Sequence, residues 1–229
     1  MDITNLAYTP LDIDAIPLNY HELDDLMSKY SLPHHPYPHI WDAFAVCGRI
    51  TAFDDATDCD KAWNDRYILD GDVQWNPHLT FDLQEKCKSM LDALPYLKYT
   101  FAQILSQKID VAPHQDGLYD PTAPVRAAVY GGADGFNGEP EPAGLKVMLS
   151  HKNIRSFYLS ERAGSKRNFI KIPDDTNSFA CNERKYYHGA KHPGEKKYIL
   201  STFGIIDRTR HTELIERSVR KYNEYTIWF

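Results

Sequence analysis

Apolar residues recur along the chain with two periods, one typical of helices and the other of strands. Helical spacing begins after Asn19 and again after Thr80, two residues suited to cap a helix, and the second of these segments ends at Pro95. A third helical pattern begins at Thr212. The apolar positions of the three are Leu23, Leu26, Met27 and Tyr30; Leu83, Cys87, Met90, Leu91 and Leu94; and Ile215, Val219 and Tyr222. The pattern therefore predicts three amphipathic helices.

Most other apolar residues fall in short runs rich in β-branched and aromatic side chains, which is typical of strands. These runs cover residues 44–50, 99–105, 125–130, 145–149, 154–159, 169–172, 177–181 and 198–206. Repeated short strands separated by turns are typical of a jelly roll. The chain of 229 residues is therefore predicted to be mainly β with flanking helices, in a single domain.

Three residues that can bind a metal accompany these strands. His114 and Asp116 follow the run at 99–105, and because side chains alternate along a strand, both would project to the same face. His188 precedes the run at 198–206 and would supply a third ligand from a second strand. Two imidazoles and one carboxylate on one face leave open positions, which suits a non-haem Fe(II) that binds a cosubstrate and O₂. For the His-x-Asp motif alone, the alternative is a chance pairing in a loop without a metal.

A basic residue lies at the start of the last strong strand run. Lys197 could pair with the far carboxylate of a dicarboxylate cosubstrate, and Ser201, four residues on and on the same strand face, could add a hydrogen bond. Lys196 is the alternative anchor if the strand register differs by one residue. Alternation favours Lys197, because this residue shares a face with Ser201.

Together these residues resemble a known superfamily. The pattern of His114, Asp116 and His188, then a basic residue followed by Tyr-Ile-Leu-Ser, resembles the Fe(II)/2-oxoglutarate-dependent dioxygenases, whose core is a double-stranded β-helix, a cupin-like jelly roll. The segment 194–199 is similar to the Gly-x-basic-Tyr segment of prolyl-hydroxylase-like members, and the general plan resembles the aspartyl/asparaginyl β-hydroxylases. A lysine stands here where arginine is commoner, and its point charge lacks the bidentate fork of a guanidinium.

The resemblance implies an activity and a set of cofactors. Fe(II) would be held by the catalytic residues His114, Asp116 and His188, while Lys197 and Ser201 would bind 2-oxoglutarate, with O₂ as the second cosubstrate. The reaction would hydroxylate an unactivated C–H bond of an amino acid or peptidyl residue. Two alternatives remain: a cupin-like or jelly-roll module that binds metal without turnover, and an interaction protein that kept only the fold.

Arg126 is the one charged residue in the apolar run at 125–130. A guanidinium inside a sheet needs a partner, and arginine binds carboxylates bidentately. Arg126 could therefore hold the carboxylate of the substrate, the role that an arginine at a similar place has in several of the hydroxylases that the sequence resembles. An internal salt bridge to an aspartate or glutamate is the alternative.

The resemblance also suggests how the predicted domain is divided. Residues 97–207 would form the jelly-roll core, with the helices and strands of residues 1–96 supporting it. Residues 208–229 would form a C-terminal helix and tail, whose apolar end should dock on the domain itself, with docking on a second copy of the chain as the alternative. Residues 131–144 are either a mobile flap over the site or a plain connection.

Composition limits the environment and the partners. The net charge of −6 and the pI near 5.9 lack the overall basicity of a strong duplex nucleic-acid binder, so nucleic acid is not the expected partner, although a local basic groove would be compatible with this charge. The resemblance implies a small-molecule or peptide substrate. The four cysteines form no Cys-x-x-Cys pair, which fits reduced thiols. With no signal-like N-terminus and no long apolar window, the chain is expected to be cytoplasmic, without a membrane segment. The oligomeric state stays open.

Overall fold

The protein is presented as a computed structural model. It describes residue 3 and residues 5–33, 39–49, 72–115, 144–149 and 156–229, with residues 184 and 193 excepted. Asp116 and Arg126 lie outside these ranges, as do the run predicted at 125–130 and nearly all of the predicted flap or connection at 131–144. Those predictions remain untested.

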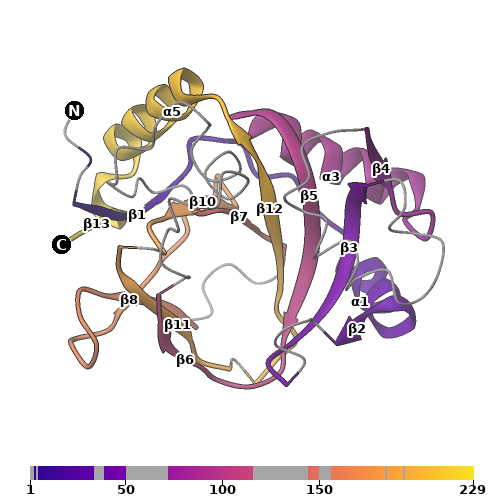
Figure 1. Ribbon diagram of the computed structural model, residues 1–229, viewed down its shortest axis with the longest axis horizontal. Helices are drawn as coiled ribbons and strands as arrows, with labels where there is room; N and C mark the ends of the chain where they lie inside the picture. Colours follow the sequence, from indigo (N-terminus) through magenta and orange to yellow (C-terminus); the bar gives the residue numbers. More distant parts are fainter. Residues whose placement is uncertain are drawn as a thin grey trace, which may run out of the picture.

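Two antiparallel sheets form the body of the molecule (Figure 1). Within the described residues the large sheet has nine strands. Their order is β13 (Ile227–Trp228), β1 (Leu6–Pro10), β10 (Ser178–Cys181), β7 (Gly144–Met148), β12 (Tyr198–Ile206), β5 (Tyr96–Gln107), β3 (Trp41–Arg49) and β2 (Leu32–Pro33), with β4 (Val73–Trp75) also paired to β3. The small sheet has four strands in the same described part, in the order β6 (Val111–His114), β11 (Tyr187–Ala190), β8 (Phe157–Ser160) and β9 (Asn168–Phe169). The two sheets face each other across a shared apolar core.

The strand order is that of a double-stranded β-helix. From β5 onward the chain passes from the large sheet to the small one at β6, returns at β7, and enters the small sheet again for β8 and β9. It then places β10 in the large sheet, β11 in the small sheet and β12 in the large sheet. This repeated crossing between two antiparallel sheets defines a jelly roll. The predicted fold class, mainly β with flanking helices, is confirmed.

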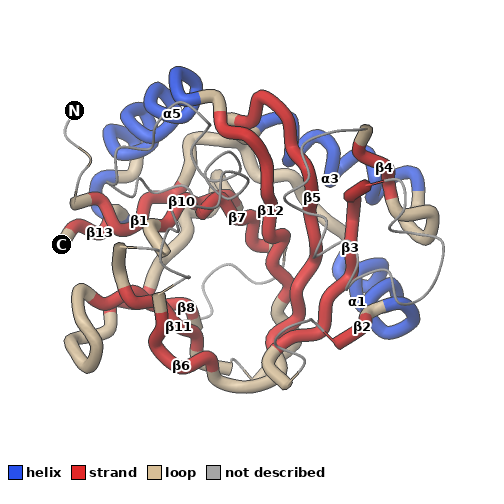
Figure 2. Tube along the Cα trace, in the orientation of Figure 1, coloured by secondary structure: helices blue, strands red, loops and turns tan. Residues whose placement is uncertain are grey.

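Helices cover one side of the large sheet (Figure 2). They are α1 (Tyr20–Tyr30), α3 (Phe81–Ala93) and α5 (Arg208–Lys221), followed by the 3₁₀ helix η2 (Asn223–Tyr225). Asn19 and Thr80 cap α1 and α3 as predicted, and the Thr80 hydroxyl also donates to Glu22 of α1. Of the helices in the described part, none has the length and apolar content to cross a bilayer.

The C-terminal segment forms a helix followed by a strand that pairs with the domain. Helix α5 begins at Arg208 with Asp207 as its cap, four residues before Thr212, where its apolar pattern begins. The apolar end of the chain docks on the domain itself, as predicted: β13 pairs with β1, and the Phe229 and Tyr186 ring centroids are 4.9 Å apart. The tail thus closes one edge of the large sheet.

Each face of the large sheet supports a different apolar cluster. The face called outer here packs on the helices and includes Leu200, Val147 and Ile104. The inner face points at the small sheet and includes Ile199 and Met148, which pack with residues of β6, β8 and β11. Any side chain of β12 two residues from Ile199 therefore also points between the sheets.

Candidate metal and cosubstrate site

Two histidines lie opposite one another on neighbouring strands of the small sheet. His114, the last residue of β6, is in register with His188 of β11, and their ring centroids are 4.3 Å apart. The His188 side chain is buried, whereas His114 is exposed. Opposed residues of an antiparallel pair share a face, so both imidazoles can reach one ion. The structure thus brings together two of the three predicted ligands.

Local contacts fix the spacing of strand β11 and the orientation of the His114 ring. Gly189 follows His188, and a Cβ there would lie 2.5 Å from the Tyr158 hydroxyl and 2.7 Å from the Val111 carbonyl oxygen, so only glycine lets β11 approach its neighbours this closely. The Nδ1 atom of His114 is 2.9 Å from the carbonyl oxygen of Ala112. A carbonyl only accepts, so Nδ1 carries the proton in that contact and the lone pair of the neutral ring is on Nε2, ready for a metal.

The third predicted ligand is not among the described residues. Strand β6 ends at His114, and Asp116 lies just beyond the described segment. Within that described part, no group of three or more His, Cys, Asp or Glu side chains is placed to hold a metal ion. The imidazole pair fits two positions of a two-histidine, one-carboxylate site for Fe(II). The complete triad remains a prediction.

Lys197 lies at the end of the inter-sheet space, one residue before β12. Only 2 % of the residue is exposed, and its ammonium donates to the Ser156 hydroxyl, which immediately precedes β8. Among the described residues no carboxylate pairs with it, and burial lowers the pKa of Lys197 to about 8. A buried cation with a neutral partner is costly, and a bound anion would relieve that cost.

The two adjacent lysines point to opposite sides of the large sheet. The Lys196 side chain is 62 % exposed and pairs with Asp24 of α1 at 3.4 Å, on the helix side, where the Tyr198 hydroxyl also donates to Asp24 at 2.5 Å. Lys197 instead reaches Ser156 beside the small sheet. The predicted alternation is therefore observed. Whether Lys197 binds a cosubstrate stays a prediction.

Ser201 belongs to a polar row across the inner face of the large sheet. It is directly opposite Gln103 of β5 on one side and Lys146 of β7 on the other. Ser201 and Gln103 are both buried, at 8 % and 3 % exposure. Side chains in register on neighbouring strands lie on one face, so three polar groups line the inter-sheet side where apolar residues would otherwise pack. Ser201, the predicted cosubstrate contact, thus has a polar residue beside it on each neighbouring strand.

One acidic residue of the site was missed by sequence reasoning. Glu183, in the connection between β10 and β11, forms an ion pair with Lys146. Its Oε1 atom lies 3.7 Å from Nε2 of His188. The Phe157 ring packs on the same imidazole, with centroids 5.8 Å apart. The candidate site therefore contains a buried carboxylate that no motif pointed to.

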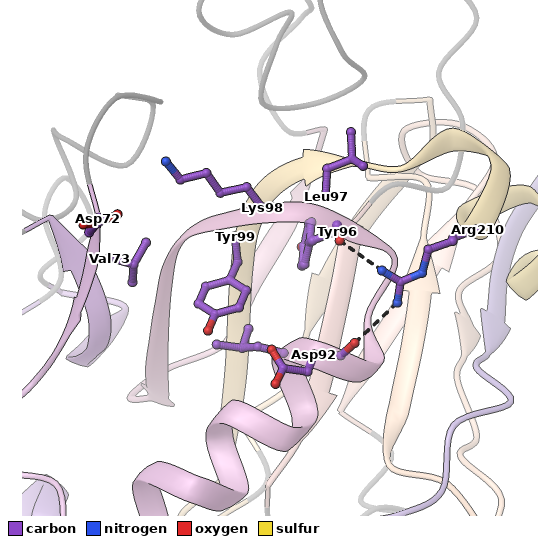
Figure 3. Close-up of a pocket in the computed structure, with 9 residues that line it drawn as sticks. Asp72, Val73, Asp92, Tyr96, Leu97, Lys98, Tyr99 and Arg210 are labelled. Atoms are coloured by element: carbon purple, nitrogen blue, oxygen red, sulfur yellow. Dashed lines mark hydrogen bonds between the residues drawn. The ribbon is translucent and has the colours of Figure 1, made fainter.

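A separate hollow lies on the helix side of the large sheet (Figure 3). It has a volume of about 510 Å³ and is lined by Asp72, Val73, Leu91, Asp92, Tyr96, Leu97, Lys98, Tyr99 and Arg210. The guanidinium of Arg210 donates to the carbonyl oxygens of Tyr96, Leu94 and Asp92 at 3.1 to 3.4 Å. Two of these carbonyls, those of Asp92 and Leu94, lie at the C-terminal end of α3, so the arginine acts as a cap of that helix. Of the predicted site residues that the structure describes, none lines this hollow.

The fold is similar to known oxygenase structures. One is an oxidoreductase of the 2OG-Fe(II) oxygenase family from Burkholderia pseudomallei, 12% identical, with 80% of this chain and 75% of that chain covered and a TM-score of 0.34. Another is a prolyl hydroxylase from Trichoplax adhaerens in complex with a hypoxia inducible factor oxygen degradation domain peptide fragment, 10% identical, with 84% and 78% covered and a TM-score of 0.35. No protein-family model matches the sequence, and no curated protein shows significant similarity to it. The jelly-roll assignment rests on the strand order itself.

Proposed function

We propose that the protein is an Fe(II)- and 2-oxoglutarate-dependent oxygenase that hydroxylates a C–H bond of an amino acid or peptidyl residue. The observation that carries this proposal is the buried ammonium of Lys197, which has a hydroxyl partner but no carboxylate partner among the described residues. The neighbour of Ser156, Phe157, packs on His188. A buried cation and an imidazole pair thus flank the same stretch of the small sheet, an arrangement that supports binding of a metal-chelating dicarboxylate.

Each residue of the proposed site has a distinct task. His114 and His188, completed by Asp116, would hold Fe(II) on one face and leave positions open. Lys197 and Ser201 would hold the far carboxylate of 2-oxoglutarate by a charge-assisted contact and a hydrogen bond. When bound, the metal and cosubstrate supply the oxidation: O₂ converts 2-oxoglutarate to succinate and CO₂ while one C–H bond becomes C–OH. The apolar inter-sheet core would keep water from this reaction.

The deciding experiment separates binding from turnover. Under anaerobic conditions the purified protein should bind one Fe(II) and, with Fe(II) present, one 2-oxoglutarate. On admission of air, succinate formation is then measured across a panel of free amino acids and short peptides, and at least one should stimulate it above the substrate-free rate. Binding of both ligands with no stimulated turnover would instead identify a metal-binding jelly-roll module. Failure to bind either ligand would leave only an interaction protein with this fold.

Arg126 provides the substrate-level prediction. We propose that its guanidinium binds a carboxylate of the substrate, because an unpaired charge in the run at 125–130 would be costly without such a partner. Arg126→Ala should then lower substrate-stimulated succinate formation at least tenfold, since a hydrogen bond to a charged group is worth about 1.5 to 3 kcal/mol. Binding of Fe(II) and 2-oxoglutarate should be unchanged.

A second arginine serves as the control for this variant. Arg162 lies in the connection between β8 and β9, with 82 % of its side chain exposed, and Arg162→Ala should leave every measurement as in the wild type. Equal succinate formation by Arg126→Ala and wild type would remove Arg126 from the substrate site. Loss of 2-oxoglutarate binding in Arg126→Ala would assign it to the cosubstrate instead.

A further inference from the structure

Three charged or ionisable side chains connect the large sheet to the histidine pair. Lys146 comes from β7 in the large sheet, Glu183 from the connection between β10 and β11, and His188 from β11 in the small sheet. The Lys146 ammonium pairs with Glu183, whose Oε1 lies 3.7 Å from the His188 Nε2. The Lys146 ammonium also lies 5.9 Å from the centroid of the Phe157 ring, which packs on the imidazole. The carboxylate therefore stands between a cation and an imidazole.

Burial of the Lys146–Glu183 ion pair has an unfavourable desolvation free energy. The side chains of Lys146, Glu183 and His188 are only 16 %, 8 % and 6 % exposed. Removing two charges from water costs several kcal/mol for each ion, and apolar residues of similar volume often replace a buried ion pair with no loss of stability. Stability alone therefore does not explain why the pair sits beside His188. A role at the imidazole does.

We propose that Glu183, held in place by Lys146, is a positioning residue for His188. This inference rests on the proposed function, in which His188 binds a divalent metal. A carboxylate beside the ring nitrogen that does not bind the metal fixes the orientation of an imidazole and makes it a better electron-pair donor, so Nδ1 of His188 would be the metal-binding atom. Lys146 balances the charge of Glu183 and anchors the carboxylate to the opposite sheet. Metal affinity at the histidine pair thereby depends on a contact between the two sheets.

Titration with Co(II), a spectroscopically visible divalent ion, tests this role without requiring turnover. Glu183→Gln keeps the size of the side chain and removes its charge, and it should bind Co(II) about 10- to 100-fold more weakly than the wild type. The control is Asp110→Asn, which removes an exposed carboxylate paired with Lys191 at 2.7 Å, next to the ends of β6 and β11. This control should bind Co(II) with wild-type affinity and show the wild-type absorption spectrum.

A double variant distinguishes a positioning role from a structural one. Lys146→Met combined with Glu183→Met removes both charges and retains apolar bulk, so its thermal unfolding temperature should match or exceed that of the wild type. Its Co(II) affinity should nevertheless stay about 10- to 100-fold below the wild type. Should Glu183→Gln fail to fold, this variant carries the test alone.

The outcomes separate the inference from the proposed function. Equal Co(II) affinities of the wild type and the folded Glu183 variants overturn the positioning role while leaving the metal site intact. Tighter binding by Glu183→Gln also overturns it, because the carboxylate would then compete with the metal for His188. A wild-type protein that binds no Co(II) overturns the metal site itself and the positioning role with it.

Discussion

Replacement of His188 by alanine should abolish stoichiometric Fe(II) binding while leaving the protein folded. His188 is one of two imidazoles held in register on β6 and β11, and its loss leaves His114 as the only imidazole at that position among the described residues. A single imidazole with one carboxylate holds a divalent ion far less tightly than the complete set. Anaerobic equilibrium dialysis with quantification of iron measures the change, and we expect bound Fe(II) to fall from one per chain to near none.

A nearby exposed histidine is the matched control. His192 lies two residues beyond the end of β11, and His192→Ala should bind Fe(II) like the wild type. Thermal unfolding adds a second readout, because a ligand that binds only the folded state raises the unfolding temperature. Fe(II) should stabilise the wild type and His192→Ala but not His188→Ala. If His188→Ala still binds one Fe(II) with wild-type affinity, His188 is not a ligand.

Replacement of Lys197 by methionine should weaken 2-oxoglutarate binding about ten- to a hundredfold. The variant keeps the length of the side chain but loses the buried ammonium, and a hydrogen bond to a charged group is worth about 1.5 to 3 kcal/mol. Because the wild-type cation pays a desolvation cost, methionine should not destabilise the fold. Calorimetric titration of 2-oxoglutarate into the anaerobic Fe(II) protein measures the affinity.

The neighbouring lysine and the pH provide the controls for this prediction. Lys196 is exposed on the helix side, so Lys196→Met should leave the affinity unchanged. The pKa of Lys197 is lowered to about 8 by burial, so the ammonium is present below that pH and is lost as the pH rises through it. Wild-type affinity should therefore fall above pH 8, and that of Lys197→Met should not. Equal losses in the two lysine variants would show that the contact is made elsewhere.

Much of the fold could be predicted because its signals are local. Helices α1 and α3 have apolar residues at helical spacing behind a capping residue, and both begin where Asn19 and Thr80 indicate. In α5 the apolar period begins only at Thr212, because the first turn, Arg208 to His211, contains no apolar residue from which a period can be read. At that end the cap residue Asp207 marks the start of the helix. Strand pairing and order depend on contacts between distant residues, so they had to come from the structure.

The candidate site was only partly predictable for a related reason. The spacing of His114, His188 and Lys197 could be read from the sequence. In the structure the two histidines lie opposite one another on neighbouring strands and the lysine is buried. Lys146, like Arg126, is a charged residue within an apolar strand run. The argument that such a charge needs a partner was applied to Arg126 and should have been applied to Lys146 as well. Glu183 gave no such signal, because it lies in a run of polar residues that resembles a solvated turn.

Across the described residues, the two sheets of the jelly roll differ in the length of their strands and in the helices that contact them. In the large sheet β5 has 12 residues and β12 has nine, and helices α1, α3 and α5 contact its strands. In the small sheet β6, β8 and β11 have four residues each and β9 has two. Local opening is therefore expected to begin in the small sheet, while the large sheet stays closed.

Both histidines belong to this less supported sheet. A metal that binds only when β6 and β11 are paired must be released when the two strands separate. Metal binding therefore stabilises the pairing of the strands, and pairing favours metal binding by the same free energy. Scarcity of the metal would then appear first as fraying of β6 from β11, long before global unfolding. In a cell, the lifetime of the protein against proteases would then follow the supply of the proposed metal.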